Sequence, residues 1–166
     1  MKRRLLLSTI LMTGLISAAV IDRIALVVEA KVIKDSDINR EIRITDFING
    51  EKLDFTPDAR KKAANRLIDQ SIIRHEIELG RYQEASDDEI NKLLADTLRT
   101  HPSPASYGIT EAEVRKALKW QITVLRFIDI RFKPQQANTP GSDPFITWLD
   151  GARKSTNIKF KEEEIQ

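Results

Sequence analysis

The sequence predicts a mostly α-helical domain whose two ends meet in a small β-sheet. Apolar residues recur at three- and four-residue spacing through most of the chain after residue 19, which is the period of amphipathic helices. Short stretches at residues 24–33 and 157–161 instead alternate with a period of two, which is typical of strands. The last strand needs a partner for its backbone, and the sequence offers only the opening strands, so we expect the chain ends to pair.

The first 19 residues have the pattern of a secretory signal peptide. A basic start from Lys2 to Arg4 precedes an apolar run of about a dozen residues, too short to span a bilayer comfortably. Ser17 and Ala19 then supply the small residues that precede a cleavage point. We therefore expect cleavage between Ala19 and Val20, and the alternative is an uncleaved membrane anchor.

Charge and composition argue against several classes of function once this segment is removed. It holds three of the 27 basic residues and no acidic residue, which leaves 24 basic against 25 acidic residues, a net charge of −1. Without a surplus of positive charge, nucleic-acid binding loses its main support. The chain has no cysteine, which excludes zinc sites and nucleophilic chemistry based on cysteine. The remaining 147 residues, 20–166, fit one domain with its own core.

The predicted domain opens with two short strands and a helix. Residues 24–28 alternate in polarity, the sequence EAK turns the chain, and residues 32–33 begin a second strand. Ser36 suits the N-cap of a helix over about residues 37–48. On this helix we expect a buried face of Ile38, Ile42 and Thr45.

The strongest helix signal runs from Thr56 to Gly80. Thr56 suits the N-cap, and Pro57 suits the first turn, where its missing N–H costs nothing. Gly80 marks the expected end. The apolar stripe is wide, which predicts neighbours on more than one side, and it consists of Ala64, Leu67, Ile68, Ile72, Ile73, Ile77 and Leu79.

Two capping boxes predict the next two helices. Ser86 with Glu89 opens the first and Thr110 with Glu113 opens the second, while residues 99–108 break the pattern between them with two prolines. The second helix is apolar over about half its circumference, so we expect it to be the central helix of the domain. The expected buried residues are Ile90, Leu93, Leu94 and Leu98 on the first helix and Val114, Leu118, Leu125, Ile128 and Phe132 on the second, with Ala117, Trp120, Val124 and Phe127 beside them.

A proline-rich break separates the last two elements from the rest. Residues 134–142 predict a linker, because their prolines and small polar residues cannot continue a helix. Asp143 or Ser142 suits the N-cap of a final helix, which has Pro144 in its first turn. A short strand follows, and we expect residues 162–166 to form a solvated tail. The expected apolar residues of these last elements are Phe145, Ile146, Trp148, Leu149, Ala152, Ile158 and Phe160.

No catalytic, cofactor-binding or metal-binding motif is found in the sequence. His75 and His101 are isolated from each other and offer too few ligands for a closed metal site. The carboxylates gather at helix starts, where capping and the helix dipole explain them. The G-x-S-x-G elbow and the glycine-rich phosphate loops are missing. We therefore expect no enzymatic activity, no cofactor and no metal.

A set of large apolar side chains near the proline-rich break is the remaining candidate for function. These side chains either pack together as core or line a groove for an extended polypeptide, and the sequence leaves both interpretations open. The candidate polypeptide-binding residues are Trp120, Phe127, Phe132, Phe145 and Trp148.

The order of four segments resembles the N-terminal domain of the SurA family of periplasmic chaperones. These segments are IDRIALVVEAKVIKDSDINREI, RLIDQSIIRHEIELG, GITEAEVRKALKWQITVLRFIDIRF and DPFITWLDGARKSTNIKF. The last is similar to the family's W-L-x-x-x-R-x-x-x-x-I-x-(F/Y) pattern, at Trp148, Leu149, Arg153, Ile158 and Phe160. The resemblance covers nearly the whole chain after residue 19.

The resemblance implies a chaperone core without an isomerase. SurA-like proteins insert parvulin-type prolyl isomerase domains between the helical core and the C-terminal helix. This chain holds only residues 134–142 there, too few to form a domain with a core. It also differs at residues 99–108, where relatives often have a short extra helix. The implied core consists of residues 20–133 and 143–161.

The function that the resemblance implies is that of a periplasmic, ATP-independent holdase. Its clients would be unfolded or outer-membrane-bound polypeptides. The alternative is a non-catalytic interaction subunit of an envelope assembly complex, with one fixed partner. Neither function requires nucleic acid, nor a membrane span after signal removal. A homodimer that swaps the C-terminal helix is compatible with the length of the linker.

Overall fold

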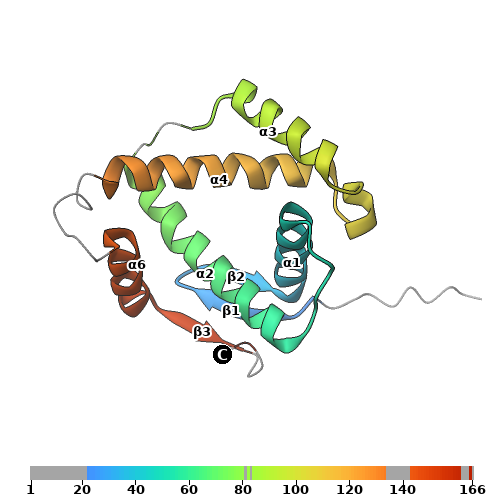
Figure 1. Cartoon of the computed structure of the whole chain (residues 1–166). Coiled ribbons are helices and arrows are strands. Elements are labelled where there is room, and N and C mark those ends of the chain that lie inside the picture. The colour runs from blue at the N-terminus through green and yellow to red at the C-terminus, as the bar shows by residue number, and fades with distance from the viewer. Residues whose placement is uncertain (1–21, 81, 83, 134–142, 162–164, 166) are drawn as a thin grey trace, which may run out of the picture.

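The computed structural model describes residues 22–80, 82, 84–133, 143–161 and 165, and Figure 1 shows its elements. The fold is mostly helical with a small antiparallel sheet, as the sequence predicts. In chain order the elements are β1 (Ile24–Val28), β2 (Lys31–Lys34), α1 (Asp35–Asn49), α2 (Pro57–Gly80), α3 (Asp87–Thr100), the 3₁₀ helix η1 (Pro104–Tyr107), α4 (Glu111–Arg131), α6 (Pro144–Ser155) and β3 (Ile158–Phe160).

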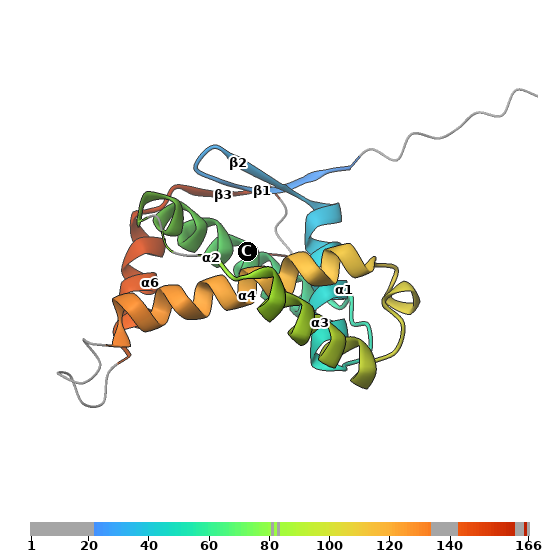
Figure 2. The same cartoon turned by 90° about the horizontal axis from the view of Figure 1, so that it is seen from above.

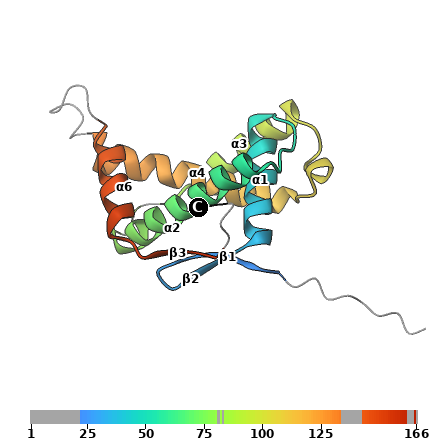
Figure 3. The ribbon, with the colours of Figure 1, turned by 90° about the horizontal axis from the view of Figure 1, so that it is seen from below.

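The sheet joins the two ends of the chain. Its strand order is β2-β1-β3 and both pairings are antiparallel, so β1 lies between its hairpin partner and the last strand. Leu26 pairs with Phe160, and Val28 pairs with Ile158. The three strands lie together on one side of the helices, with α2 next to them (Figures 2 and 3). The prediction that the chain ends pair is confirmed.

Two apolar clusters stabilise the domain, and α1 and α4 contribute to both. The larger lies among the sheet, α1, α2, the C-terminal half of α4 and α6, while the smaller lies among α1, α3 and the N-terminal half of α4. Each fully buried large apolar side chain contributes about 1.5–3 kcal/mol. The larger cluster buries Ala25, Leu26, Val28, Ile33, Ile38, Ile42, Ala63, Ala64, Ile68, Ile72, Ile73, Phe127, Phe132, Leu149 and Ile165, and the smaller buries Phe47, Leu94, Ile109, Val114 and Leu118.

The two halves of α4 bury opposite faces. Successive helical residues are rotated by about 100°, which places Val114 and Leu118 on one side and Thr123 and Phe127 on roughly the opposite side. All four are buried, because the first side meets the smaller cluster and the second side meets the larger one. Leu125 lies at the angular position of Leu118 but in the other half, and it is 56% exposed. The prediction that Leu125 is buried is therefore wrong.

Burial along the apolar stripe of α2 decreases towards its last turn. The buried residues of α2 end at Ile73, and Leu79 is exposed although it continues the stripe by spacing. The prediction that Leu79 is buried is wrong for this reason. Ala63, which the sequence pattern did not single out, is fully buried.

The predicted caps of four helices are confirmed. Thr56 Oγ1 accepts a 3.4 Å hydrogen bond from the N–H of Ala59 at the start of α2. Asp143 caps α6 by accepting from the N–H groups of its first turn. Both capping boxes are present, with Ser86 and Glu89 at α3 and Thr110 and Glu113 at α4.

The predicted N-cap of α1 is wrong. β2 runs directly into α1, so Lys34 takes the N-cap position and its N–H donates to Asp37 Oδ2 at 2.9 Å. Ser36 lies inside the first turn, where its N–H and Oγ–H both donate to the Asp22 carboxylate, at 3.1 and 2.6 Å. The hydrogen bond from the Ser36 side chain is the main reason that the pKa of Asp22 is lowered. A residue upstream of the sheet thus caps the helix.

The predicted break at residues 99–108 begins two residues later, because α3 continues to Thr100, and residues 101–108 fold over α1 as η1 and its flanks. Tyr107 packs edge-on against Phe47 with ring centroids 5.5 Å apart, and its hydroxyl donates to the carbonyl of Glu51 at 2.7 Å. Arg43 Nη1 donates to the carbonyl of Tyr107 at 2.7 Å. Phe47 is fully buried, and the sequence pattern did not identify it as core.

The expectation of a solvated tail is wrong at Ile165. This side chain is 1% exposed and belongs to the larger cluster, because removal of an isoleucine side chain from water is favourable. Residues 162–164 and 166 lie outside the described residues. So do the predicted signal segment, with its cleavage point at Ala19 and Val20, and the predicted linker at 134–142.

Candidate functional site

Four of the five candidate aromatic residues form one cluster where α4 meets α6. Phe132 packs against Phe145 at 5.5 Å and against Trp148 at 5.5 Å, and Phe127 packs against Trp148 at 5.6 Å. Phe127 and Phe132 are 0% and 4% exposed, so neither ring can contact a ligand in this structure. These two rings pack as core, which is one of the two interpretations that the sequence leaves open. Phe145 and Trp148 are half-buried and retain exposed surface.

Arg131 connects this aromatic cluster to α2. Its guanidinium carbon lies 5.7, 5.4 and 5.2 Å from the ring centroids of Phe127, Phe132 and Trp148. Its Nη1 also pairs with the carboxylate of Glu76 on α2. A cation among aromatic rings gains from the negative potential of the ring faces. Arg131 therefore helps to fix the position of Trp148 relative to α2.

Arg153 fastens α6 to α2 at a second point. Its Nε donates to Asp69 Oδ1 at 2.5 Å, while its two terminal nitrogens donate to the side-chain and backbone oxygens of Asn65 at 3.1 and 2.9 Å. The planar guanidinium suits such forked hydrogen bonding. Arg153 is one of the residues on which the SurA resemblance depends, and its contacts explain why an arginine at this position holds the final helix in place.

A groove of about 780 Å³ opens between the β1–β2 turn, α2 and α6, and we call it the α2–α6 groove. Its apolar lining includes Ile72 on α2 and Trp148 and Ala152 on α6. A Cβ added to Gly151, which also lines the groove, would have no atom within 4 Å, so the space beside this residue is open. The polar side chains around the groove are Glu29, Lys31, Ser71, His75, Glu76, Thr147, Ser155 and Thr156.

The tip of the β1–β2 turn is held against the end of α6. The N–H of Glu29 donates to the carbonyl of Asn157 at 2.9 Å, and the N–H of Asn157 donates to Glu29 Oε1 at 2.7 Å. Glu29 has a φ of 52°, a left-handed conformation that is unfavourable for residues other than glycine. The two reciprocal hydrogen bonds with Asn157 offset the conformational free energy of this backbone and fix one end of the groove.

Trp120 lies apart from the other candidates, in a second groove of about 480 Å³ that we call the α2–α4 groove. The guanidinium of Arg74 on α2 lies over its indole, 4.3 Å from the ring centroid. Ile77 and Tyr82 supply further apolar surface, and Lys119 lies on the side of α4. Of the five predicted residues, two are core, each of the two tryptophans lines one groove, and Phe145 is half-buried outside both grooves.

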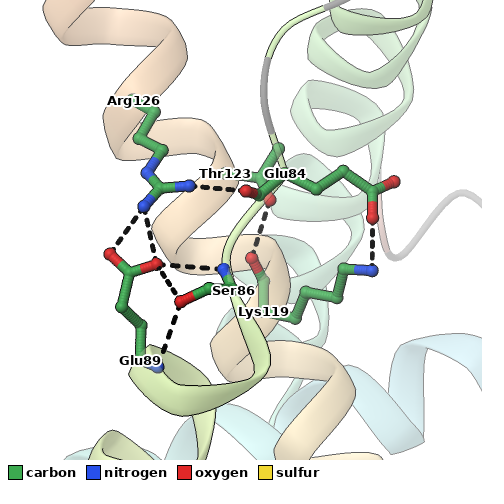
Figure 4. A network of polar contacts seen from close by, with 6 residues as sticks. All are labelled: Glu84, Ser86, Glu89, Lys119, Thr123 and Arg126. Atoms are coloured by element: carbon green, nitrogen blue, oxygen red, sulfur yellow. Dashed lines mark hydrogen bonds and ion pairs between the residues drawn. The ribbon is translucent and has the colours of Figure 1, made fainter.

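A polar network beside the α2–α4 groove ties α3 to α4 (Figure 4). Arg126 on α4 donates to both carboxylate oxygens of Glu89 at 2.5 and 2.7 Å, and to the carbonyl of Glu84 at 2.5 Å. The same carboxylate accepts from the N–H and Oγ–H of Ser86 at 2.9 and 2.7 Å. These hydrogen bonds, those from Ser86 first, lower the pKa of Glu89 to about 2.

Glu89 makes this part of the domain sensitive to acid. Because its pKa falls from 4.5 in the unfolded chain to about 2 in the folded chain, its contribution to stability is present above pH 4.5 and is lost as the pH falls towards 2. Glu89→Gln keeps a residue that capping boxes accept but removes the charge. Thermal melts should show the variant less stable than the wild type at pH 7, with the two curves converging near pH 2. A constant difference across this range would contradict the assignment.

The two histidines lie in separate parts of the fold. His75 is exposed at the α2–α6 groove, whereas His101 caps the end of α3 and packs on Phe47, with ring centroids 5.6 Å apart. Among the residues that the structure describes, no three histidine, aspartate or glutamate side chains are grouped as metal ligands. In the same part of the chain, no helix is long and apolar enough to cross a bilayer.

The lining of the α2–α6 groove is what the sequence interpretation missed. Glu29, Lys31, His75 and Gly151 gave no sequence signal, since they come from three separate elements and their convergence depends on the docking of α6. For the α2–α4 groove a signal existed. Lys116 and Trp120 are four residues apart, a spacing that places both on one side of α4.

Comparison with models of protein families and with curated proteins finds no match for this chain.

Proposed function

We propose that this protein binds extended or unfolded polypeptides as an ATP-independent periplasmic holdase, and that the α2–α6 groove is its principal binding site. The observation that carries the proposal is an open groove of about 780 Å³ with an apolar wall and a polar rim. Ligand sites commonly have volumes of about 300–1,000 Å³ and this distribution of apolar and polar groups. The sequence resemblance to the SurA family supports the same function.

The groove suits a passive binder. Trp148 and Ile72 offer apolar surface to the side chains of a client, while Ser71, His75 and Thr156 offer hydrogen-bonding groups to its backbone. Polypeptide binding of this kind needs neither a catalytic residue nor a nucleotide. Affinity then depends on the apolar area buried, less the cost of ordering the client.

An aggregation assay tests the proposal. The protein is added to a chemically denatured client that aggregates on dilution, in buffer without ATP, and light scattering is followed. We expect suppression that reaches completion near stoichiometric amounts, because each groove holds one client segment. Undiminished scattering at a several-fold molar excess would contradict holdase activity. Capture of one dominant partner from an envelope extract, without suppression, would instead identify the alternative of a dedicated interaction subunit.

A further inference from the structure

The α2–α4 groove combines an aromatic surface with an excess of positive charge. Its charged lining residues are the cations Arg74, Lys116 and Lys119 and the anions Glu78 and Glu84. Lys119 pairs with Glu84 at 2.5 Å, which neutralises both. Within the described residues, Arg74 and Lys116 form no salt bridge, so Glu78 is the one carboxylate of this lining that is left against two cations without a carboxylate partner.

Lys31 adds a further positive charge near this groove. Desolvation by burial is the first cause that lowers its pKa, and repulsion by Arg74 is the second. Attraction by Asp37 and Glu78 raises this pKa, but each effect is smaller than that of burial or of Arg74. Repulsion by Lys116 lowers the pKa further. Lys31 thus lies within the electrostatic reach of the α2–α4 groove.

The two grooves are neighbours across α2. Lys31 lines the α2–α6 groove, although its charge interacts with Arg74 and Lys116 of the other groove. On α2 itself, His75 lines the first groove and Arg74 lines the second. The two grooves therefore adjoin along α2.

We propose that the α2–α4 groove is a second polypeptide subsite that selects segments in which carboxylate side chains flank an apolar residue. The inference rests on the proposed polypeptide-binding function and adds a preference to it. The apolar residue would pack against Trp120, Tyr82 and Ile77, and the carboxylates would pair with the guanidinium of Arg74 and the ammonium of Lys116. Charge complementarity of this kind gives selectivity and faster association.

The two tryptophans of the chain allow each groove to be monitored separately. Trp148→Phe leaves Trp120 as the single reporter of the α2–α4 groove, and Trp120→Phe leaves Trp148 as the reporter of the α2–α6 groove. The probes are two peptides of equal length and equal apolar content, one with aspartate and glutamate and one with asparagine and glutamine. Inorganic phosphate serves as a third probe.

We expect the acidic peptide to change Trp120 fluorescence with a Kd about tenfold below that of the amide peptide, and to lose this advantage at high salt. Lys116→Glu should abolish the preference. The matched variant Lys92→Glu, an exposed position on α3 outside both grooves, should keep it. Equal affinities for the two peptides, or equal effects of the two lysine variants, would overturn the proposal. Competition by phosphate alone at equal strength would also overturn it and indicate a small-anion site.

These outcomes separate the two proposals. If the amide peptide changes Trp148 fluorescence while neither peptide changes that of Trp120, polypeptide binding stands and the acidic subsite is wrong. If neither tryptophan responds to any peptide, the proposed function itself is wrong.

Discussion

Replacing Phe127 with alanine is expected to lower the free energy of unfolding by about 3–5 kcal/mol. The ring is fully buried, and its centroid lies 5.1, 5.5 and 5.6 Å from those of Tyr82, Phe132 and Trp148. The substitution removes these contacts and leaves a cavity where α4 packs against α6. Since domains of this size are stable by about 5–15 kcal/mol, the loss is a large share of the total. Urea denaturation followed by circular dichroism measures it.

Leu125→Ala is the matched control on the same helix. Leu125 lies two residues away but is 56% exposed, so its truncation should change the free energy of unfolding by no more than about 0.5 kcal/mol. This contrast tests the finding that the C-terminal half of α4 buries the face opposite to its N-terminal half. Similar losses in the two variants would show that α4 is rotated from the position described above.

Local signals in the sequence predicted the elements better than the burial of single side chains. The capping boxes at Ser86 and Thr110 depend on neighbours three residues away, and both are present. Leu79 and Leu125 have the right spacing for burial but lie where no element covers them. The error at Ser36 has a similar origin, because the Asp22 carboxylate that binds it belongs to the segment before the sheet. The spacing of apolar residues predicts which face of a helix is apolar, but only tertiary packing determines whether a residue on that face is buried.

The candidate site was predictable in part. The size of the aromatic residues and their position in the chain identified those around the α4–α6 junction. Neither property distinguishes a core ring such as Phe127 from a half-exposed one such as Trp148. The remaining wall of the α2–α6 groove depends on Glu29 in a left-handed conformation and on its pairing with Asn157. These residues are far apart in sequence, and no periodicity connects them.

Gly151 offers the second large expected effect, on client binding rather than on stability. It lies on α6, lines the α2–α6 groove and has open space beside it. Gly151→Phe should fill the groove with the new ring, while Gly151→Ala should leave it open. Both variants replace a glycine inside a helix, a change that stabilises by up to about 1 kcal/mol for alanine. Neither variant should therefore lower the free energy of unfolding.

Suppression of client aggregation by this pair of variants tests the role of the groove most directly. We predict that Gly151→Ala suppresses aggregation as the wild type does, and that Gly151→Phe loses at least about nine tenths of the suppression, since an occupied groove offers a client no apolar surface. Thermal melts of the same samples would show that both variants are folded. Full suppression by a folded Gly151→Phe protein would contradict the account, because clients would then bind elsewhere.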